Sequence, residues 1–143
     1  MKKLSFALNI EDGWPPVASE SVWCELIEGG YKLVNAPFFI SGIAYGDIFK
    51  ADLDEVNGHV FEFEILEESG NSLVWVMNKE RVDITTSLKE LNSIGCRVEG
   101  FSEFNLYSID IPSSVPLARL DSIFDKIESQ GLAVAYPVWR LED

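Results

Sequence analysis

The hydrophobic pattern of this 143-residue chain changes its period near residue 71, and this change most constrains the fold. Before it, short apolar runs alternate with polar residues and are divided by turn signals, which is typical of strands. After it, apolar residues recur twice at helical spacing between further strands. We therefore expect an α+β protein with an antiparallel β lobe over residues 1–70 and an α/β lobe over residues 71–143.

The first lobe is predicted from two tight-turn signals. Gly29-Gly30 and Asn57-Gly58 each separate two apolar runs, and such pairs accept the positive φ that a hairpin turn needs. The expected strands cover residues 4–10, 21–28, 31–38, 46–55 and 59–68. Four or five antiparallel strands of this length predict a small β-barrel or a strongly curled sheet.

The second lobe is predicted to follow the order β-α-β-β-α-β. Helical spacing of apolar residues indicates one helix over residues 84–94 and a second from Ser114 to Gly131. Strands are expected at residues 72–78, 96–101, 106–112 and 132–141. Two right-handed crossovers in this order would make a ferredoxin-like βαββαβ lobe.

The segment at residues 37–49 is unusually apolar for a connection between strands. It could be an exposed binding loop or a piece of core. Left in water, so much apolar surface would favour aggregation unless a partner covered it. We expect a buried plug, formed by a short helical turn or an irregular crossover at one end of the barrel.

Net charge is the strongest compositional signal. The chain has 24 acidic and 11 basic residues and a net charge of −13. Residues 1–70 carry −9 of this and residues 71–143 carry −4. Such a field repels nucleic acid and anionic membranes and attracts basic proteins. Without a recognisable signal peptide or an apolar run near the ~18 residues of a membrane span, the chain is expected to be cytoplasmic.

Acidic residues collect around the 46–68 hairpin. In its second strand, alternation predicts Phe61, Phe63 and Ile65 on the core side and the glutamates between them on the outside. The predicted partner-binding residues are Asp52, Asp54, Glu55, Glu62, Glu64, Glu67 and Glu68. We call these seven residues the acidic strip; the alternative interpretation is an ordinary solvated strand face.

Motifs for catalysis or cofactor binding are missing from the sequence. His59 is the single histidine, and Cys24 and Cys96 are far apart and lie in apolar surroundings, so they predict buried free thiols. The glycines form no phosphate-binding pattern, and the acids near Asp52 lack calcium-loop spacing. We therefore expect no enzymatic activity, no metal and no cofactor.

Several short stretches together resemble an uncharacterised bacterial family catalogued as a domain of unknown function. They are VWCE (22–25), YKLVNAPFF (31–39), GIAYGD (42–47), SGNS (69–72) and LNSIGCRVEGF (91–101). The resemblance spans roughly residues 21–139, implies a two-lobed fold and implies no activity. Residues 1–20 depart from it.

Size, acidity and the missing chemistry are also similar to immunity proteins of contact-dependent inhibition and polymorphic toxin systems. The leading hypothesis is therefore a non-enzymatic immunity protein that neutralises a basic, nuclease-type toxin, such as an RNase. The alternative is a small-molecule-binding regulatory domain whose ligand sits near residues 37–45. The sequence leaves the oligomeric state open.

Overall fold

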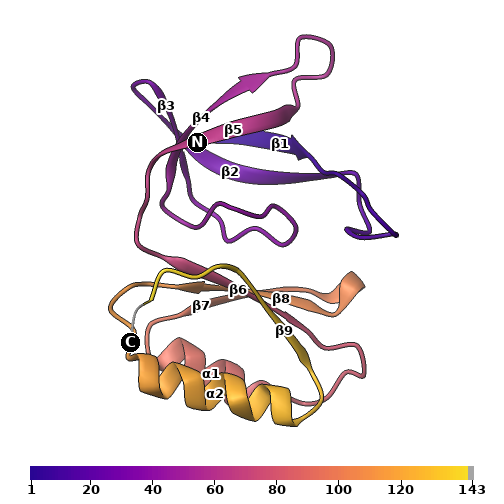
Figure 1. Cartoon of the computed structure of the whole chain (residues 1–143), viewed down its shortest axis with the longest axis vertical. Coiled ribbons are helices and arrows are strands. Elements are labelled where there is room, and N and C mark those ends of the chain that lie inside the picture. Colours follow the sequence, from indigo (N-terminus) through magenta and orange to yellow (C-terminus); the bar gives the residue numbers. More distant parts are fainter. Residues whose placement is uncertain (142–143) are drawn as a thin grey trace. The chain divides into compact units, whose positions relative to one another are not determined.

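The computed structural model describes residues 1–141 and divides the chain into two compact units, Met1–Ser69 and Gly70–Asp143. The first unit is all-β and the second is mixed (Figure 1). The strands of the first unit are β1 (Lys2–Ala7), β2 (Ser19–Ile27), β3 (Gly30–Leu33), β4 (Ile48–Leu53) and β5 (Val60–Glu67). The elements of the second are β6 (Ser72–Met77), α1 (Thr85–Ser93), β7 (Arg97–Phe101), the 3₁₀ turn η1 (Ser102–Phe104), β8 (Leu106–Ile111), α2 (Leu117–Ser129) and β9 (Ala133–Val138). The expected α+β class, with antiparallel strands in the first part, is confirmed.

The first unit is a closed barrel in the strand order β1-β2-β3-β4-β5. Neighbouring strands pair antiparallel until the ring closes, where Phe6 of β1 pairs with Val60 of β5 in parallel. Residues 1–20, whose role the sequence left open, therefore supply the strand that closes the barrel. Closure protects the strand edges that an open sheet would expose.

The segment at residues 37–49 is mostly core, which confirms the plug expected from its composition. Ile40 and Ile43 are 4% and 0% exposed and belong to the apolar cluster inside the barrel, together with Phe6 and Phe49. The segment forms an irregular crossover between β3 and β4 and contains no helical turn. Its apolar side chains are therefore not available as an exposed binding loop.

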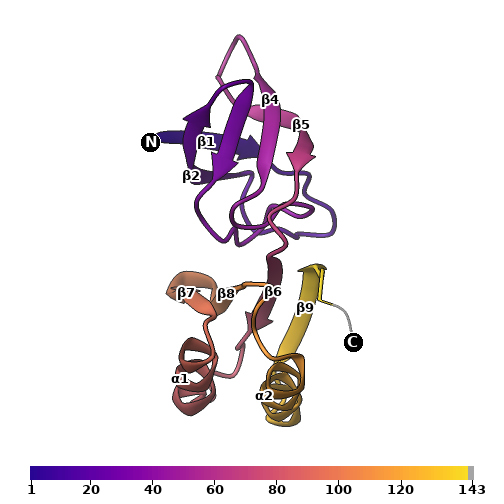
Figure 2. The same cartoon turned by 90° about the vertical axis from the view of Figure 1, so that its left-hand side faces the viewer.

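The second unit contains a four-stranded antiparallel sheet in the order β7-β8-β6-β9. Both helices lie on one face of this sheet (Figures 1 and 2). Val74 and Val76 of β6 are fully buried against Leu120 and Phe124 of α2, because alternate strand residues face the helical layer. This layered packing forms a second core, separate in composition from that of the barrel.

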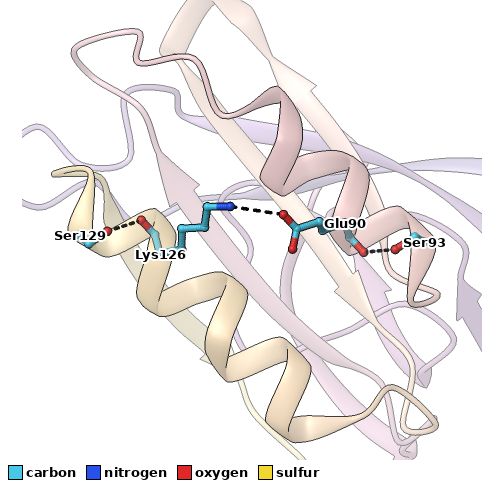
Figure 3. Close-up of polar contacts among 4 residues, drawn as sticks. All are labelled: Glu90, Ser93, Lys126 and Ser129. Atoms are coloured by element: carbon cyan, nitrogen blue, oxygen red, sulfur yellow. Dashed lines mark hydrogen bonds and ion pairs between the residues drawn. The ribbon is translucent and has the colours of Figure 1, made fainter.

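The helices also contact each other through polar groups. Lys126 of α2 lies 3.4 Å from Glu90 of α1, and each helix ends with a serine hydroxyl that donates to a backbone carbonyl three residues earlier (Figure 3). Gly95 and Gly131 follow the two helices at φ of +107° and +92°, which ends each helix as the sequence predicted. No helix within residues 1–141 is long and apolar enough to cross a membrane.

Candidate protein-binding surface

The middle of the acidic strip lies on the outer face of two paired strands. Asp52 on β4 and Glu62 and Glu64 on β5 are all exposed. Lys50 pairs directly with Glu64 across the strands, and its Nζ lies 3.3 Å from a Glu64 carboxylate oxygen. These side chains line a shallow depression of about 260 Å³. The structure thus brings three predicted residues together and adds a lysine that offsets part of their charge.

The other four acids of the strip lie toward the two ends of the hairpin. Asp54 and Glu55 belong to the turn before β5, where the Asp54 carboxylate accepts the Asn57 backbone N–H at 3.1 Å. Glu67 ends β5 and Glu68 follows it. Because five residues of extended strand cover about 16 Å, Glu62 and Glu67 cannot contact one small group together. The strip is an elongated surface, and only its middle is a cluster.

The exposure of Phe61 contradicts the alternation that was predicted for β5. It was predicted to face the core with Phe63 and Ile65, but its side chain is 62% exposed. Between the pairs Ala51–Phe63 and Leu53–Val60, β5 has one residue more than β4. Such a bulge shifts the inward and outward positions by one residue, so Val60 takes the buried place and Phe61 points out.

A second irregularity lies at the other end of β5. The pairs Ile48–Glu67 and Phe49–Ile65 leave Leu66 as the extra residue, and its side chain is 50% exposed. The central acids are therefore flanked along the strand by an exposed aromatic and an exposed aliphatic side chain. Alternation from Glu64 already places Leu66 on the outside, whereas it missed the exposure of Phe61, since nothing in the local pattern marks a bulge.

This combination suits a protein partner in chemical terms. Carboxylates held on a rigid sheet attract Lys and Arg side chains with little entropy loss on their own side. Exposed aromatic and aliphatic groups supply the apolar contacts in which interfaces concentrate their binding energy. The residues that line the depression include neither a nucleophile nor a histidine.

Glu20 is a structurally important carboxylate whose role was not predicted from the sequence. It lies at the start of β2, and its two oxygens accept the backbone N–H groups of Phe38, Phe39 and Ile40 at 2.7, 2.8 and 3.1 Å. The side chain therefore holds the beginning of the plug against the barrel wall. A glutamate some 18 residues away carries no local signal of this role.

Asp47 has a similar structural role at the end of the plug. It is 0% exposed, and its oxygens accept the backbone N–H groups of Ala44 and Ser69 at 2.9 Å each. The preceding Gly46 has φ of +87°, and a Cβ there would lie 2.9 Å from Ser69 Cβ. The Gly-Asp pair thus ties the plug to the end of the barrel unit and is already occupied by protein contacts.

The sulfur and imidazole groups take no part in the surface. Burial raises the pKa of the Cys24 thiol to about 11, and burial with the nearby Asp110 carboxylate raises the pKa of Cys96 to about 12. Both thiols therefore stay protonated at neutral pH. His59 sits in the β4–β5 turn, where its backbone N–H donates to Asn57. Residues 1–141 contain no group of three metal-ligating side chains close enough to share an ion.

Comparison with known proteins places the chain in a family without assigning a function. No curated protein matches it. A solved structure described as a novel crystal structure of a hypothetical protein from Neisseria gonorrhoeae is similar in fold, with a TM-score of 0.79 and 15% sequence identity over 98% of this chain and 96% of that one. The family described as Domain of unknown function (DUF4265) matches residues 20–135. Because this match covers most of the chain, the protein belongs to the DUF4265 family.

Proposed function

We propose that this protein is a non-enzymatic, cytoplasmic protein-binding module, and most concretely an immunity protein that neutralises a basic, nuclease-type toxin. The observation that carries the proposal is the β4–β5 surface, where Asp52, Glu62 and Glu64 are exposed beside Phe61 and Leu66. A basic active cleft that normally holds phosphates would meet fixed carboxylates there. The apolar pair would anchor the complex after electrostatic capture.

The second unit has a supporting role in this proposal. We infer a ferredoxin-like lobe, because the order β7-β8-β6-β9 is the one that two βαβ crossovers produce when each encloses a strand of the other. Its net charge of −4 adds to the long-range field, while the barrel unit carries −9. We expect the barrel unit to make the specific contacts.

The partner should be a basic toxin encoded beside this gene, and the test starts from that pair. The two proteins are coexpressed in a bacterial host, where the immunity protein is expected to restore growth that the toxin stops. Their dissociation constant is then measured over a series of salt concentrations. Electrostatic capture predicts that association slows as salt rises.

Charge reversal distinguishes specific binding by the β4–β5 surface from a general effect of the protein's net negative charge. The double variant Asp52→Lys and Glu62→Lys should weaken binding at least several-fold. The matched control, Asp121→Lys and Asp125→Lys on exposed positions of α2, changes the net charge by the same amount elsewhere. Equal weakening by both variants would show that net charge alone explains the loss of binding and that the β4–β5 surface makes no specific contact with the partner. Failure to protect from any neighbouring toxin would reject the immunity role.

Phe61→Ala tests the apolar part of the surface without changing charge. Truncation of an interface anchor costs about 2 kcal/mol or more, which corresponds to about 30-fold in the dissociation constant. Val56 is 92% exposed in the neighbouring turn and outside the strand pair, so Val56→Ala is the matched control. Equal binding by Phe61→Ala and the wild type would show that the aromatic ring is not an anchor.

A further inference from the structure

The second unit contains a pocket of about 330 Å³ that the proposed protein-binding function does not use. The loop after β6 forms one wall, and the β7–β8 connection with its flanking residues forms the other. Arg81, Phe101, Ser102, Asn105 and Tyr107 are among its lining residues. The volume lies at the small end of ligand sites, which span roughly 300–1,000 Å³. Such a pocket suits a small molecule of about one ring and is too small for a peptide.

Arg81 is the cation of this pocket. Its side chain makes no hydrogen bond or ion pair with any other residue in the described range 1–141. Lys50, Arg97 and Lys126, in contrast, each lie within 4.0 Å of a carboxylate. In a chain with 24 acidic residues, an unpaired guanidinium on a residue that lines a pocket leaves its charge available to an incoming anion.

The backbone of Arg81 is held by its neighbours before any ligand arrives. Its backbone has φ of +55°, and its N–H donates to the Asn78 carbonyl at 3.1 Å. The Asn78 side chain is 5% exposed and bonds both the N–H and the C=O of Val82, at 2.9 and 2.7 Å. The loop is thus closed by its own hydrogen bonds, and a preorganised loop loses little entropy when it binds a ligand.

The opposite wall is aromatic. Gly100 pairs with Tyr107 across β7 and β8, and a Cβ on Gly100 would lie 3.4 Å from the Tyr107 ring. The ring therefore leans over the glycine. Phe101 follows Gly100 on β7 and pairs with Leu106, so its side chain lies on the other face of the sheet, where it packs edge-to-face on Phe104 with ring centroids 4.9 Å apart. The planar ring of Tyr107 is therefore the aromatic surface that this wall offers to another ring.

We propose that this pocket binds a small molecule that carries a carboxylate on an aromatic ring. The planar guanidinium of Arg81 matches a carboxylate with two parallel hydrogen bonds, and the ring of Tyr107 offers a stacking surface to the ligand's ring. A phosphate is a poorer fit: Arg81 is the pocket's one cation among the described lining residues, and the amides of Arg81 and Val82 are already hydrogen-bonded. The site is independent of the β4–β5 surface.

The test is a titration of the ¹⁵N-labelled full chain with benzoate, followed by amide chemical shifts. We expect shifts in the 78–82 loop and in residues 100–107. Benzamidine has a similar ring and the opposite charge, so it should leave these amides unchanged. Inorganic phosphate, an anion without a ring, should bind more weakly than benzoate.

Arg81→Asn is the informative variant, because asparagine tolerates the positive φ of this position and the loop should keep its fold. Loss of the charge-assisted bonds should weaken benzoate binding about tenfold or more. Arg119→Gln removes an exposed arginine of α2 outside the pocket and should bind benzoate like the wild type. The proposal is overturned if both variants lose affinity equally, if benzamidine shifts the same amides, or if benzoate shifts none of them up to about 10 mM, which would detect a millimolar Kd.

Discussion

Replacing Glu20 by glutamine is expected to loosen the start of the plug. In the wild type, Oε2 accepts the Phe38 N–H, and Oε1 accepts the N–H groups of Phe39 and Ile40. Glutamine keeps one acceptor oxygen, which can retain the Phe39 and Ile40 bonds. Its NH₂ group then faces the Phe38 N–H, so this bond is lost and two donors meet.

The magnitude follows from the kind of bond that disappears. A hydrogen bond to a charged group contributes about 1.5–3 kcal/mol. If the segment opens locally, this loss should speed hydrogen exchange at the Phe38 amide by about 10- to 150-fold. Glu20→Ala removes all three acceptor contacts, so exchange should accelerate at the Phe39 and Ile40 amides as well.

The assay is amide hydrogen exchange on the full chain, read residue by residue by NMR. Glu25→Gln is the matched control, because Glu25 is an exposed glutamate on the same strand and is not an acceptor for the plug. It should leave exchange in residues 38–40 within a factor of about two. Unchanged exchange at Phe38 in Glu20→Gln would refute the view that this carboxylate holds the segment.

Three further changes test the packing and the buried charge. Gly30→Ala should lower the free energy of unfolding by about 1–3 kcal/mol, because its Cβ would collide with the Phe49 carbonyl oxygen; urea denaturation that matches the wild type would contradict this. Ile43→Ala should cost about 2–5 kcal/mol in the same assay, because the side chain is 0% exposed, and a loss below about 1 kcal/mol would argue against the plug as core. Burial raises the pKa of the Asp110 carboxyl, and the hydrogen bond from Asn71 and the charge of Arg97 offset part of this rise. The stabilisation that comes from the raised pKa is complete below the unfolded pKa of about 3.9 and declines as the pH rises through the folded pKa. Asp110→Asn should therefore gain stability relative to the wild type as pH rises from that point toward neutral, and a pH-independent difference would reject the assignment.

Local sequence signals predicted much of the fold because they act over a few residues. The Gly29-Gly30 and Asn57-Gly58 turns divide strands where they were expected, and helical spacing located α1 and α2 to within a few residues. The composition of residues 37–49 predicted a buried segment for a similar reason, since apolar surface of that amount favours burial in any fold.

The candidate surface was predicted only in part. Alternation identified Glu62 and Glu64 as outward residues, and they are exposed. It placed Phe61 on the wrong side, because this residue lies at a register shift between β4 and β5. It also could not reveal that Lys50 pairs with Glu64, since that contact depends on the register of two strands.

By itself, the sequence determined the strand and helix periods, the turns and the acidic charge, all of which depend on neighbouring residues or on composition. The tertiary structure decided three features: the closure of the barrel by β1 and β5, the hydrogen bonds from residues 38–40 to Glu20, and the pocket lined by Arg81 and Tyr107. Each of these joins residues far apart in the chain. Whether these residues come into contact depends on strand register and barrel closure. Both are determined by the packing of the whole unit, so no periodic pattern within a single segment predicts them.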